Sequence, residues 1–522
     1  MPRSPLAAVA AAALLIALLP ASASAKGFTY SVTAGEVTSS SAVLWTRSDK
    51  SGTVRLTVSR DKSFGGKDPR FDLKATSSHD NTVQRKVTKL LPGTVYYYRF
   101  SLGSNRSDIG RFKTAPTAAR VQTITFGLTG DADAVPTTGQ TKAYWNNFEV
   151  YREMAEEGND FNINLGDTIY SDSEVPGRGE LAESLAAKWL KYKTNIGMPN
   201  LQVARRSTGF YSHWDDHEFR NDFSKPEFGS AIYKAGVQAF RDFAPVTYDS
   251  KRGIYRKFRW GKNVELFFLD ERSFRSAKAA EACINPETGK PDLAPTMPQD
   301  KRNTFSALVP SLAQPVSQQC LDAINSSQRT YLGADQLARF KKEIAASSAT
   351  FKVVINELPI QQAYALPYDR WEGYAAERRN VLEYLKAKVK NVVFLTTDVH
   401  ATWTNDARLQ TLEPGGPVNT GILESSVGPA ATASFAREVD EATGREGNGA
   451  VIGPAFFKPQ PPDGVGMLCS QNNVFSYMEV KVSAKALTLT PKDLNGQLVR
   501  EPDAQGANNG NPCGPFTVTR KK

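Results

Sequence analysis

Short apolar runs separated by polar turns dominate the first part of the chain. The runs are rich in β-branched and aromatic side chains, with Gly, Asp and Ser between them, and fall at residues 43–46, 54–58 and 95–100. This pattern predicts strands at the spacing of a small β-sandwich. Leu91-Pro92-Gly93-Thr94 before the tyrosine-rich run is typical of fibronectin type III-like modules. We therefore predict an all-β N-terminal domain over residues 27–116.

From about residue 120 onward, apolar runs alternate with helical patterns. Strands are predicted at 121–128, 161–165, 264–269, 351–355 and 392–395, and helices at 143–157 and 378–388. Residues 476–490 and 515–519 alternate as surface strands do, and a Pro-, Ala- and Ser-rich stretch at about 276–326 is expected to be an insertion. The β-α-β order predicts an α/β domain over residues 120–520, with functional residues at the carboxyl ends of its strands.

Ionisable side chains gather where these buried strands end. Leu165-Gly166-Asp167 is followed by Tyr170, Asp215-Asp216-His217-Glu218 comes fifty residues later, and Asp398-Val399-His400 ends a third strand. A carboxylate at such a place is costly unless it binds a proton, a cation or a hydrogen-bond donor. Three such clusters predict a multinuclear metal site of the kind that handles phosphate esters.

Each cluster also has a plainer interpretation. Asp131 and Asp133 follow the first strand of the larger domain and could hold a hard cation or form a solvated turn. Asp216 and its neighbours could form an internal ion-pair network, and His400 could be a core histidine. His217 is suited to protonating a leaving group near neutral pH.

Two arginines follow the strand at 264–269. Arg272 or Arg275 could clamp phosphate oxygens through paired hydrogen bonds. They could equally neutralise Asp270 or the carboxylate cluster, and the sequence leaves both interpretations open.

Composition narrows the setting of the protein. The 522 residues carry a net charge of +10, and the pI is about 9.2. Because the sequence has no Lys/Arg block, we expect no dedicated nucleic-acid partner. The positive charge leaves an anionic cell-envelope polymer or lipid open as a partner. Residues 1–25 have the pattern of a secretory signal peptide. The four cysteines therefore predict disulfides, and we favour Cys283–Cys320 and Cys469–Cys513 among three possible pairings.

Taken together, these motifs resemble the PhoD-like alkaline phosphatase family of metallophosphoesterases. The resemblance rests on Val43-Leu44-Trp45-Thr46-Arg47, Leu165-Gly166-Asp167-Thr168-Ile169-Tyr170, Asp215-Asp216-His217-Glu218, Asp270-Glu271-Arg272-Ser273-Phe274-Arg275, Trp371-Glu372-Gly373-Tyr374 and Asp398-Val399-His400, in the order of the family. It implies a metallophosphoesterase-type β-sandwich core flanked by helices, preceded by the small all-β domain.

The resemblance also implies a metal set and ligands. The family uses ferric iron and calcium, and other divalent metals are possible. Carried over by position, the metal ligands are Asp167, Tyr170, Asp216, Asp398 and His400, with His217 beside Asp216. From the residues themselves we add Asp131 as a metal ligand, and His217 and Arg275 as catalytic residues. The family often has a cysteine iron ligand after the first strand, where this chain has Asp131 or Asp133, and it often has a twin-arginine leader, which this chain lacks.

We therefore expect an exported phosphate-ester hydrolase of the alkaline phosphatase or phosphodiesterase type. It would be secreted, periplasmic or bound at the cell surface, and monomeric. Two alternatives are a phospholipase D-like diesterase on the same scaffold and a non-catalytic extracellular binding protein derived from it. The missing cysteine favours the second alternative, and the joint presence of Asp167, Tyr170, His217 and His400 argues against it.

Overall fold

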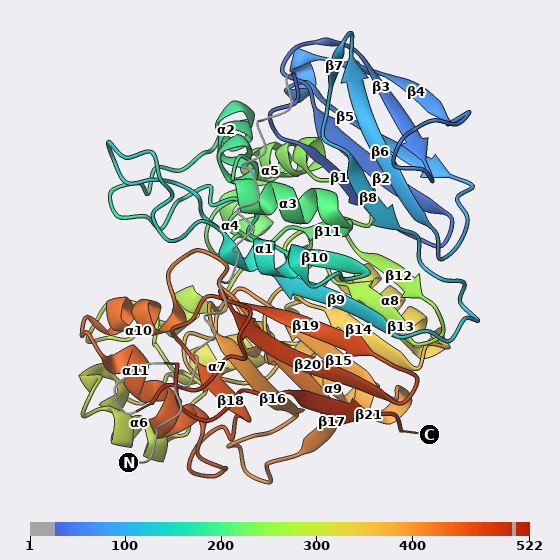
Figure 1. Cartoon of the computed structure of the whole chain (residues 1–522). Coiled ribbons are helices and arrows are strands. Elements are labelled where there is room, and N and C mark those ends of the chain that lie inside the picture. Colours follow the sequence, from blue (N-terminus) through green and yellow to red (C-terminus); the bar gives the residue numbers. More distant parts are fainter. Residues whose placement is uncertain (1–26, 504–507, 522) are drawn as a thin grey trace, which may run out of the picture.

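Two mixed β-sheets packed face to face form the centre of the molecule (Figure 1). The computed structural model describes residues 27–503 and 508–521, so the predicted signal peptide at 1–25 lies outside the described residues. Side chains such as Ile163 from one sheet and Val353 from the other meet in one apolar core. No helix among the described residues is long and apolar enough to span a membrane.

The first sheet has nine strands. Their order is β21 (Phe516–Thr519), β20 (Ala486–Asp493), β19 (Ser476–Val482), β9 (Ile124–Thr129), β10 (Phe161–Leu165), β11 (Gly209–His213), β1 (Val32–Gly35), β2 (Ser41–Arg47) and β5 (Thr82–Thr88). Strands β9, β10 and β11 are parallel, so their carboxyl ends lie at the same edge. The helices α1 (Glu149–Glu156), α2 (Leu185–Ile196), α3 (Pro199–Ser207), α4 (Lys225–Phe228) and α5 (Ser230–Phe243) belong to the same half of the chain.

The second sheet has seven strands. Their order is β12 (Arg256–Trp260), β13 (Val264–Phe268), β14 (Phe351–Ile355), β15 (Val392–Thr396), β17 (Asn419–Ser426), β16 (Thr402–Arg408) and β18 (Cys469–Gln471). Alternate residues of a strand face opposite sides: Val353 points to the inter-sheet core, and Val354 to α8 (Ala334–Ala346) and α9 (Ala375–Lys388). Both faces of these strands are covered, which agrees with the apolar runs 353–355 of β14 and 392–395 of β15.

The N-terminal region is all-β, as predicted, but it shares a sheet with the larger domain. A five-stranded sheet contains β4 (Arg70–Ala75), β3 (Gly52–Ser59), β6 (Val95–Leu102), β7 (Asn105–Arg106) and β8 (Gly110–Lys113). The other layer of this sandwich is the β1–β2–β5 end of the nine-stranded sheet, where β1 runs parallel to β11. The sequence pattern could not reveal this, because it does not show which edge strand a neighbour will extend.

The predicted elements otherwise match the structure closely, with one clear difference. The strands at 161–165 and 351–355 have the predicted bounds, and residues 476–490 form the hairpin of β19 and β20. The helix predicted from residue 143 begins only at Glu149, because Phe148 is left-handed (φ 61°) and donates its N–H to Asn146 Oδ1. An asparagine side chain that satisfies a nearby backbone N–H competes with helix formation.

The insertion carries α6 (Gln299–Phe305) and α7 (Gln318–Asn325). It lies beside α10 (Phe435–Thr443) and α11 (Asn448–Ile452), and Figure 1 shows α6, α10 and α11 gathered at one end of the molecule. Met297 and Leu312 of the insertion share an apolar cluster with Val439 of α10. A buried ion pair from Arg302 to both carboxylate oxygens of Asp292 (2.7 and 2.8 Å) braces the insertion from within.

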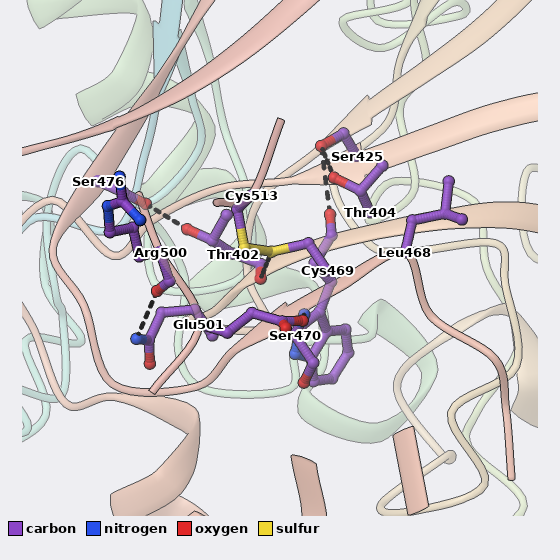
Figure 2. The surroundings of a disulfide bond; sticks show 12 residues. Thr402, Thr404, Ser425, Leu468, Cys469, Ser470, Ser476, Arg500, Glu501 and Cys513 are labelled. Atoms are coloured by element: carbon purple, nitrogen blue, oxygen red, sulfur yellow. Dashed lines mark hydrogen bonds between the residues drawn. A yellow bond between two sulfur atoms is a disulfide. The ribbon is translucent and has the colours of Figure 1, made fainter. Parts of the chain in front are cut away.

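Both predicted disulfides are present, Cys283–Cys320 and Cys469–Cys513. Figure 2 shows the second bond, beside Thr402 of β16. Cys469 lies on β18, the edge of the seven-stranded sheet, and Cys513 precedes β21, the edge of the nine-stranded sheet. This disulfide therefore ties the outer edges of the two sheets together.

Removal of Cys469–Cys513 should have a large effect on stability. The bond closes a loop with a sequence separation of 44 residues and both cysteines are fully buried. On the chain-entropy account, the double variant Cys469→Ala/Cys513→Ala should lose about 4 kcal/mol of unfolding free energy. Denaturant unfolding of the oxidised proteins measures this, and a loss below about 1 kcal/mol would contradict the role assigned to the bond.

Glu424 of β17 anchors the segment that follows β14. Its carboxylate accepts the backbone N–H groups of Ile360 (2.6 Å) and Gln361 (2.9 Å). Burial raises the pKa of Glu424 from 4.5 to about 7, although these hydrogen bonds oppose the shift. The folded protein therefore holds this proton to a higher pH than the unfolded chain does.

Glu424 should for this reason make folding pH-dependent. Because its folded pKa is raised, its contribution to stability is complete below pH 4.5 and is lost as the pH rises through about 7. Relative to Glu424→Gln, wild-type protein should lose up to about 3 kcal/mol over this interval. Urea unfolding of both proteins between pH 4.5 and 7.5 tests this, and parallel stability profiles would disprove it.

Candidate metal centre

The carboxyl ends of strands from both sheets converge on one cluster of acidic and histidine side chains. Asp131, Asp167 and His400 have ligand atoms within 4.8 Å of one another, although they follow three different strands. The same holds for Asp167, Asp216 and His217, and for Asp215, Asp216 and Asp398. The structure thus brings together the residues that the sequence analysis assigned to the metals.

The backbone at these ligands is held in an unusual conformation. Asp131 (φ 60°), Asp167 (φ 47°), Asp398 (φ 67°) and His400 (φ 49°) all lie in the left-handed region. Non-glycine residues adopt this region at a cost of order 1–3 kcal/mol each, and such strain is concentrated at functional sites. The turns that end these strands therefore direct the side chains into the cluster at the expense of local stability.

Several carboxylate oxygens in the cluster have the environment of metal ligands. Asp131 Oδ2 and Asp216 Oδ1 are buried and have no hydrogen-bond partner. A Cβ added to Gly428 would lie 2.5 Å from Asp131 Oδ2, so glycine preserves the space around this oxygen. Buried unpaired carboxylate oxygens beside imidazole suit hard or borderline cations. The residues present therefore fit a cluster of bound metal ions.

The raised pKa values of the clustered carboxyl groups also support bound cations. Burial, together with repulsion from Asp216 and Asp215, raises the pKa of Asp167 well above its usual range. Burial also raises the pKa of Asp131 to about 8, even though His400 opposes the shift. Carboxylates packed this closely require protons or cations to offset their charge, and a bound cation would restore their ionised form.

Asp133, the alternative to Asp131, is engaged elsewhere. Its Oδ1 accepts the N–H of Val135 (3.0 Å) and its Oδ2 the hydroxyl of Ser173 (2.5 Å). Asp131 is therefore the carboxylate of this turn that faces the cluster.

The aromatic members of the site are coupled to one another. Tyr170 Oη lies 3.0 Å from His400 Nε2, and the Tyr170 ring stacks on His217 with a centroid separation of 4.0 Å. His217 Nδ1 lies 2.8 Å from Asp172, and His400 Nδ1 lies 2.5 Å from Glu438. A second carboxylate thus orients His217, as is common around metal-bound imidazoles, and Glu438 forms an ion-pair contact with His400.

The acidic neighbours of the two histidines also raise their pKa values. Burial alone would lower the pKa of His217, but Asp216 and Asp172 outweigh burial and raise it well above its usual value. Glu438 likewise outweighs burial and raises the pKa of His400 to about 10. His213 differs: burial and Arg256 lower its pKa, and its Nε2 contacts the backbone carbonyl of Leu269, which is a structural role.

Arg272, rather than Arg275, is the arginine at the centre of the acidic cluster. The fully buried Arg272 guanidinium lies 2.5 Å from Asp215, 2.6 Å from Asp369 and 3.1 Å from Asp398. Arg275 is bound to the other oxygen of Asp369 and does not line the cavity. The structure therefore places Arg275 where it positions Asp369, not where it would contact a phosphate in the cavity.

A polar cavity of about 1350 Å³, partly open to solvent, lies over the cluster. Its wall includes Asp167, Asp216, His217, Asp398 and His400, and also residues that the sequence analysis did not single out: Asp172, Glu174, Asp369, Arg370 and Glu438. Asp172 and Glu174 follow Tyr170 closely, so the motif around Tyr170 could have indicated them. The other three come from a loop and from α10, and no local pattern marks them.

Comparison with known proteins identifies the family. The sequence profile of the PhoD-like phosphatases matches residues 135–483, and the profile of their N-terminal domain matches residues 11–116. The chain belongs to the PhoD-like phosphatase family. It is 26% identical over 428 residues to alkaline phosphatase D of Bacillus subtilis (strain 168), an alignment that covers 73% of this chain and 65% of the relative. The chain thus spans just under two thirds of the length of that relative.

Solved structures show the same fold. A structure of PhoD matches with a TM-score of 0.68 and 21% identity, covering 95% of this chain and 90% of the other. Purple acid phosphatase PPD1 from yellow lupin (Lupinus luteus) seeds matches with a TM-score of 0.55 and 11% identity, covering 94% and 74%. The PhoD-like fold and the buried Asp/His clusters agree with the metal site expected of this family.

Proposed function

We propose that this protein is a metal-dependent phosphoesterase of the alkaline phosphatase or phosphodiesterase type. The observation that carries the proposal is the meeting of Asp131, Asp167, Asp216, Asp398 and His400 beneath one polar cavity. Membership of the PhoD-like phosphatase family supports it. A phosphate ester is the substrate class, and the net charge of +10 favours the approach of an anion.

The donor set supports ferric iron with calcium as the metals. Tyr170 beside His400 supplies the oxygen and nitrogen donors of an iron position, while Asp131, Asp216 and Asp398 supply hard carboxylates. All four cysteines are in disulfides, so Asp131 takes the place of the family's cysteine ligand. Bound cations would supply Lewis acidity to the phosphoryl oxygens and lower the pKa of a bound water.

Other residues of this chain would donate a proton to the leaving group and provide positive charge around the cavity. Asp172 receives Nδ1–H of His217, which leaves Nε2 of this protonated ring to donate a proton to the leaving-group oxygen. Arg370 lines the cavity and supplies positive charge at its wall. Arg272 and Arg275 hold Asp369 and Asp398 in place from behind.

Export from the cytoplasm belongs to the same proposal. The two disulfides are formed in the structure, and such bonds persist in oxidising compartments. We assign the protein to the periplasm, the cell surface or the medium, as a monomer.

Hydrolysis of p-nitrophenyl phosphate and bis-p-nitrophenyl phosphate tests the proposal. Purified mature protein should turn over at least one of the two esters, lose this activity to a chelator and regain it when calcium and iron are restored. Asp167→Ala should be inactive under all conditions, because Asp167 belongs to two of the ligand groups. The absence of turnover with calcium, iron, manganese and zinc would favour a non-catalytic binding protein instead.

A further inference from the structure

An apolar groove of about 640 Å³, partly open to solvent, adjoins the metal cavity. Three parts of the chain form it: the insertion, the loop after β14, and the α10–α11 region. Representative wall residues are Met297, Leu312, Leu366, Val439 and Ile452. Its wall is almost entirely carbon.

The groove and the metal cavity open beside each other. Leu366 and Ala442 belong to the walls of both. Ala442 is exposed and Leu366 is half-buried, so the boundary between the two hollows lies at the surface and not within a packed core. Along α10, Glu438 faces the metal cavity, and Val439 faces the apolar groove.

The wall of the groove is braced in advance of any ligand. Cys283–Cys320 closes the insertion, and the ion pair of Arg302 with Asp292 holds its interior. At the mouth, Val451 remains 42% exposed, so an apolar side chain is left in water there. A preformed apolar surface of this kind is a mark of a binding site.

We propose that this groove receives the hydrocarbon chain of a phosphate ester whose phosphate lies in the metal cavity. This inference rests on the proposed phosphoesterase function and narrows its substrate class to esters that carry an alkyl or acyl substituent. The polar cavity suits the phosphate, and the carbon-lined groove suits a group that gains by leaving water. Each buried methylene contributes about 0.8 kcal/mol, or roughly fourfold in affinity.

Two diesters with the same leaving group test the proposal. p-Nitrophenyl methyl phosphate and p-nitrophenyl octyl phosphate both release p-nitrophenol when water forms the new P–O bond, and they differ only in the chain. With loaded enzyme below the micellar concentration, kcat/KM for the octyl ester should be at least tenfold higher. Leu308→Gln/Ile452→Gln, at two half-buried groove positions, should remove this advantage and leave methyl-ester turnover unchanged.

A matched control and a binding measurement separate the outcomes. Leu190→Gln alters an exposed leucine of α2 outside the groove and should retain the octyl preference. Calorimetry with octylphosphonate and methylphosphonate measures binding in the groove without turnover. Octylphosphonate should bind wild-type protein at least tenfold more tightly than methylphosphonate does, and the groove variant should lose this difference.

The results distinguish the two proposals. Methyl-ester turnover with no octyl advantage in either measurement would overturn the groove assignment and leave the phosphoesterase in place. Tight octylphosphonate binding that the groove variant loses, without turnover of either ester, would support the groove and remove the catalytic proposal. The protein could instead sediment with phosphatidylglycerol vesicles and fail to be released by octylphosphonate. That result would assign the groove to a membrane surface and overturn the inference.

Discussion

Replacing Asp131 with asparagine should remove one metal ion and lower phosphate-ester turnover by about 100-fold or more. Asp131 Oδ2 is buried, has no hydrogen-bond partner, and belongs to the ligand group of Asp167 and His400. An amide keeps the shape of the side chain but provides a neutral and weaker ligand. Elemental analysis of the purified variant and its kcat/KM on p-nitrophenyl phosphate measure both effects.

The neighbouring Asp133 provides the matched control. Asp133→Asn alters an equally buried carboxylate two residues away, whose oxygens are bound to Ser173 and Val135. It should lower stability without loss of metal. In metal-stripped protein at pH 9, Asp131→Asn should raise the melting temperature, because the pKa of about 8 leaves Asp131 charged there, with its buried Oδ2 lacking a hydrogen-bond partner. Full metal content in Asp131→Asn would refute the ligand assignment.

Replacing Arg272 with methionine should cost about 3–5 kcal/mol of unfolding free energy in metal-free protein. The guanidinium lies within 3.1 Å of carboxylate oxygens of Asp215, Asp369 and Asp398. Its removal leaves the buried Asp215 and the partly buried Asp398 without this positive charge, whereas Asp369 keeps Arg275. Since bound cations would offset the same charges, added calcium should raise the melting temperature of Arg272→Met more than that of wild type. Differential scanning calorimetry with and without calcium measures this difference.

A second buried arginine separates this effect from the general cost of breaking an ion pair. Arg302→Met removes the partner of Asp292 inside the insertion, away from the acidic cluster. This variant should be less stable than wild type, but calcium should raise the melting temperature of both proteins by the same amount. If calcium raised the melting temperature of Arg272→Met by no more than that of wild type, Arg272 and the metals would not neutralise a common set of carboxylates.

Much of the site could be predicted because its ligands follow buried strands. Asp167 and Asp398 stand where apolar runs end in polar residues, and such residues have no local reason to be acidic. The β-α-β order placed both residues at the carboxyl ends of strands, but they follow strands of different sheets, so their meeting depends on how the two sheets pack. Glu438 and Asp369 could not be found this way, because they lie on a helix and a loop whose patterns are ordinary.

The choice between neighbouring residues also required the folded structure. Asp131 and Asp133 are alike in sequence, and only the hydrogen bonds of Asp133 to Ser173 and Val135 set them apart. Likewise, Arg272 and Arg275 both follow β13, yet Arg272 enters the cluster and Arg275 stands behind Asp369. Which oxygen or guanidinium group remains available depends on neighbours far away along the chain.

The sequence by itself determined the alternation of strands and helices and the chemistry at the strand ends. These are local properties, because side-chain periodicity and strand exits lie within a few residues of one another. The tertiary structure decided that the N-terminal strands extend the core sheet, that Arg272 neutralises the acidic cluster, and that an apolar groove borders the metal cavity. These features depend on contacts between distant segments, and the free energy of such contacts is set only when the chain is packed.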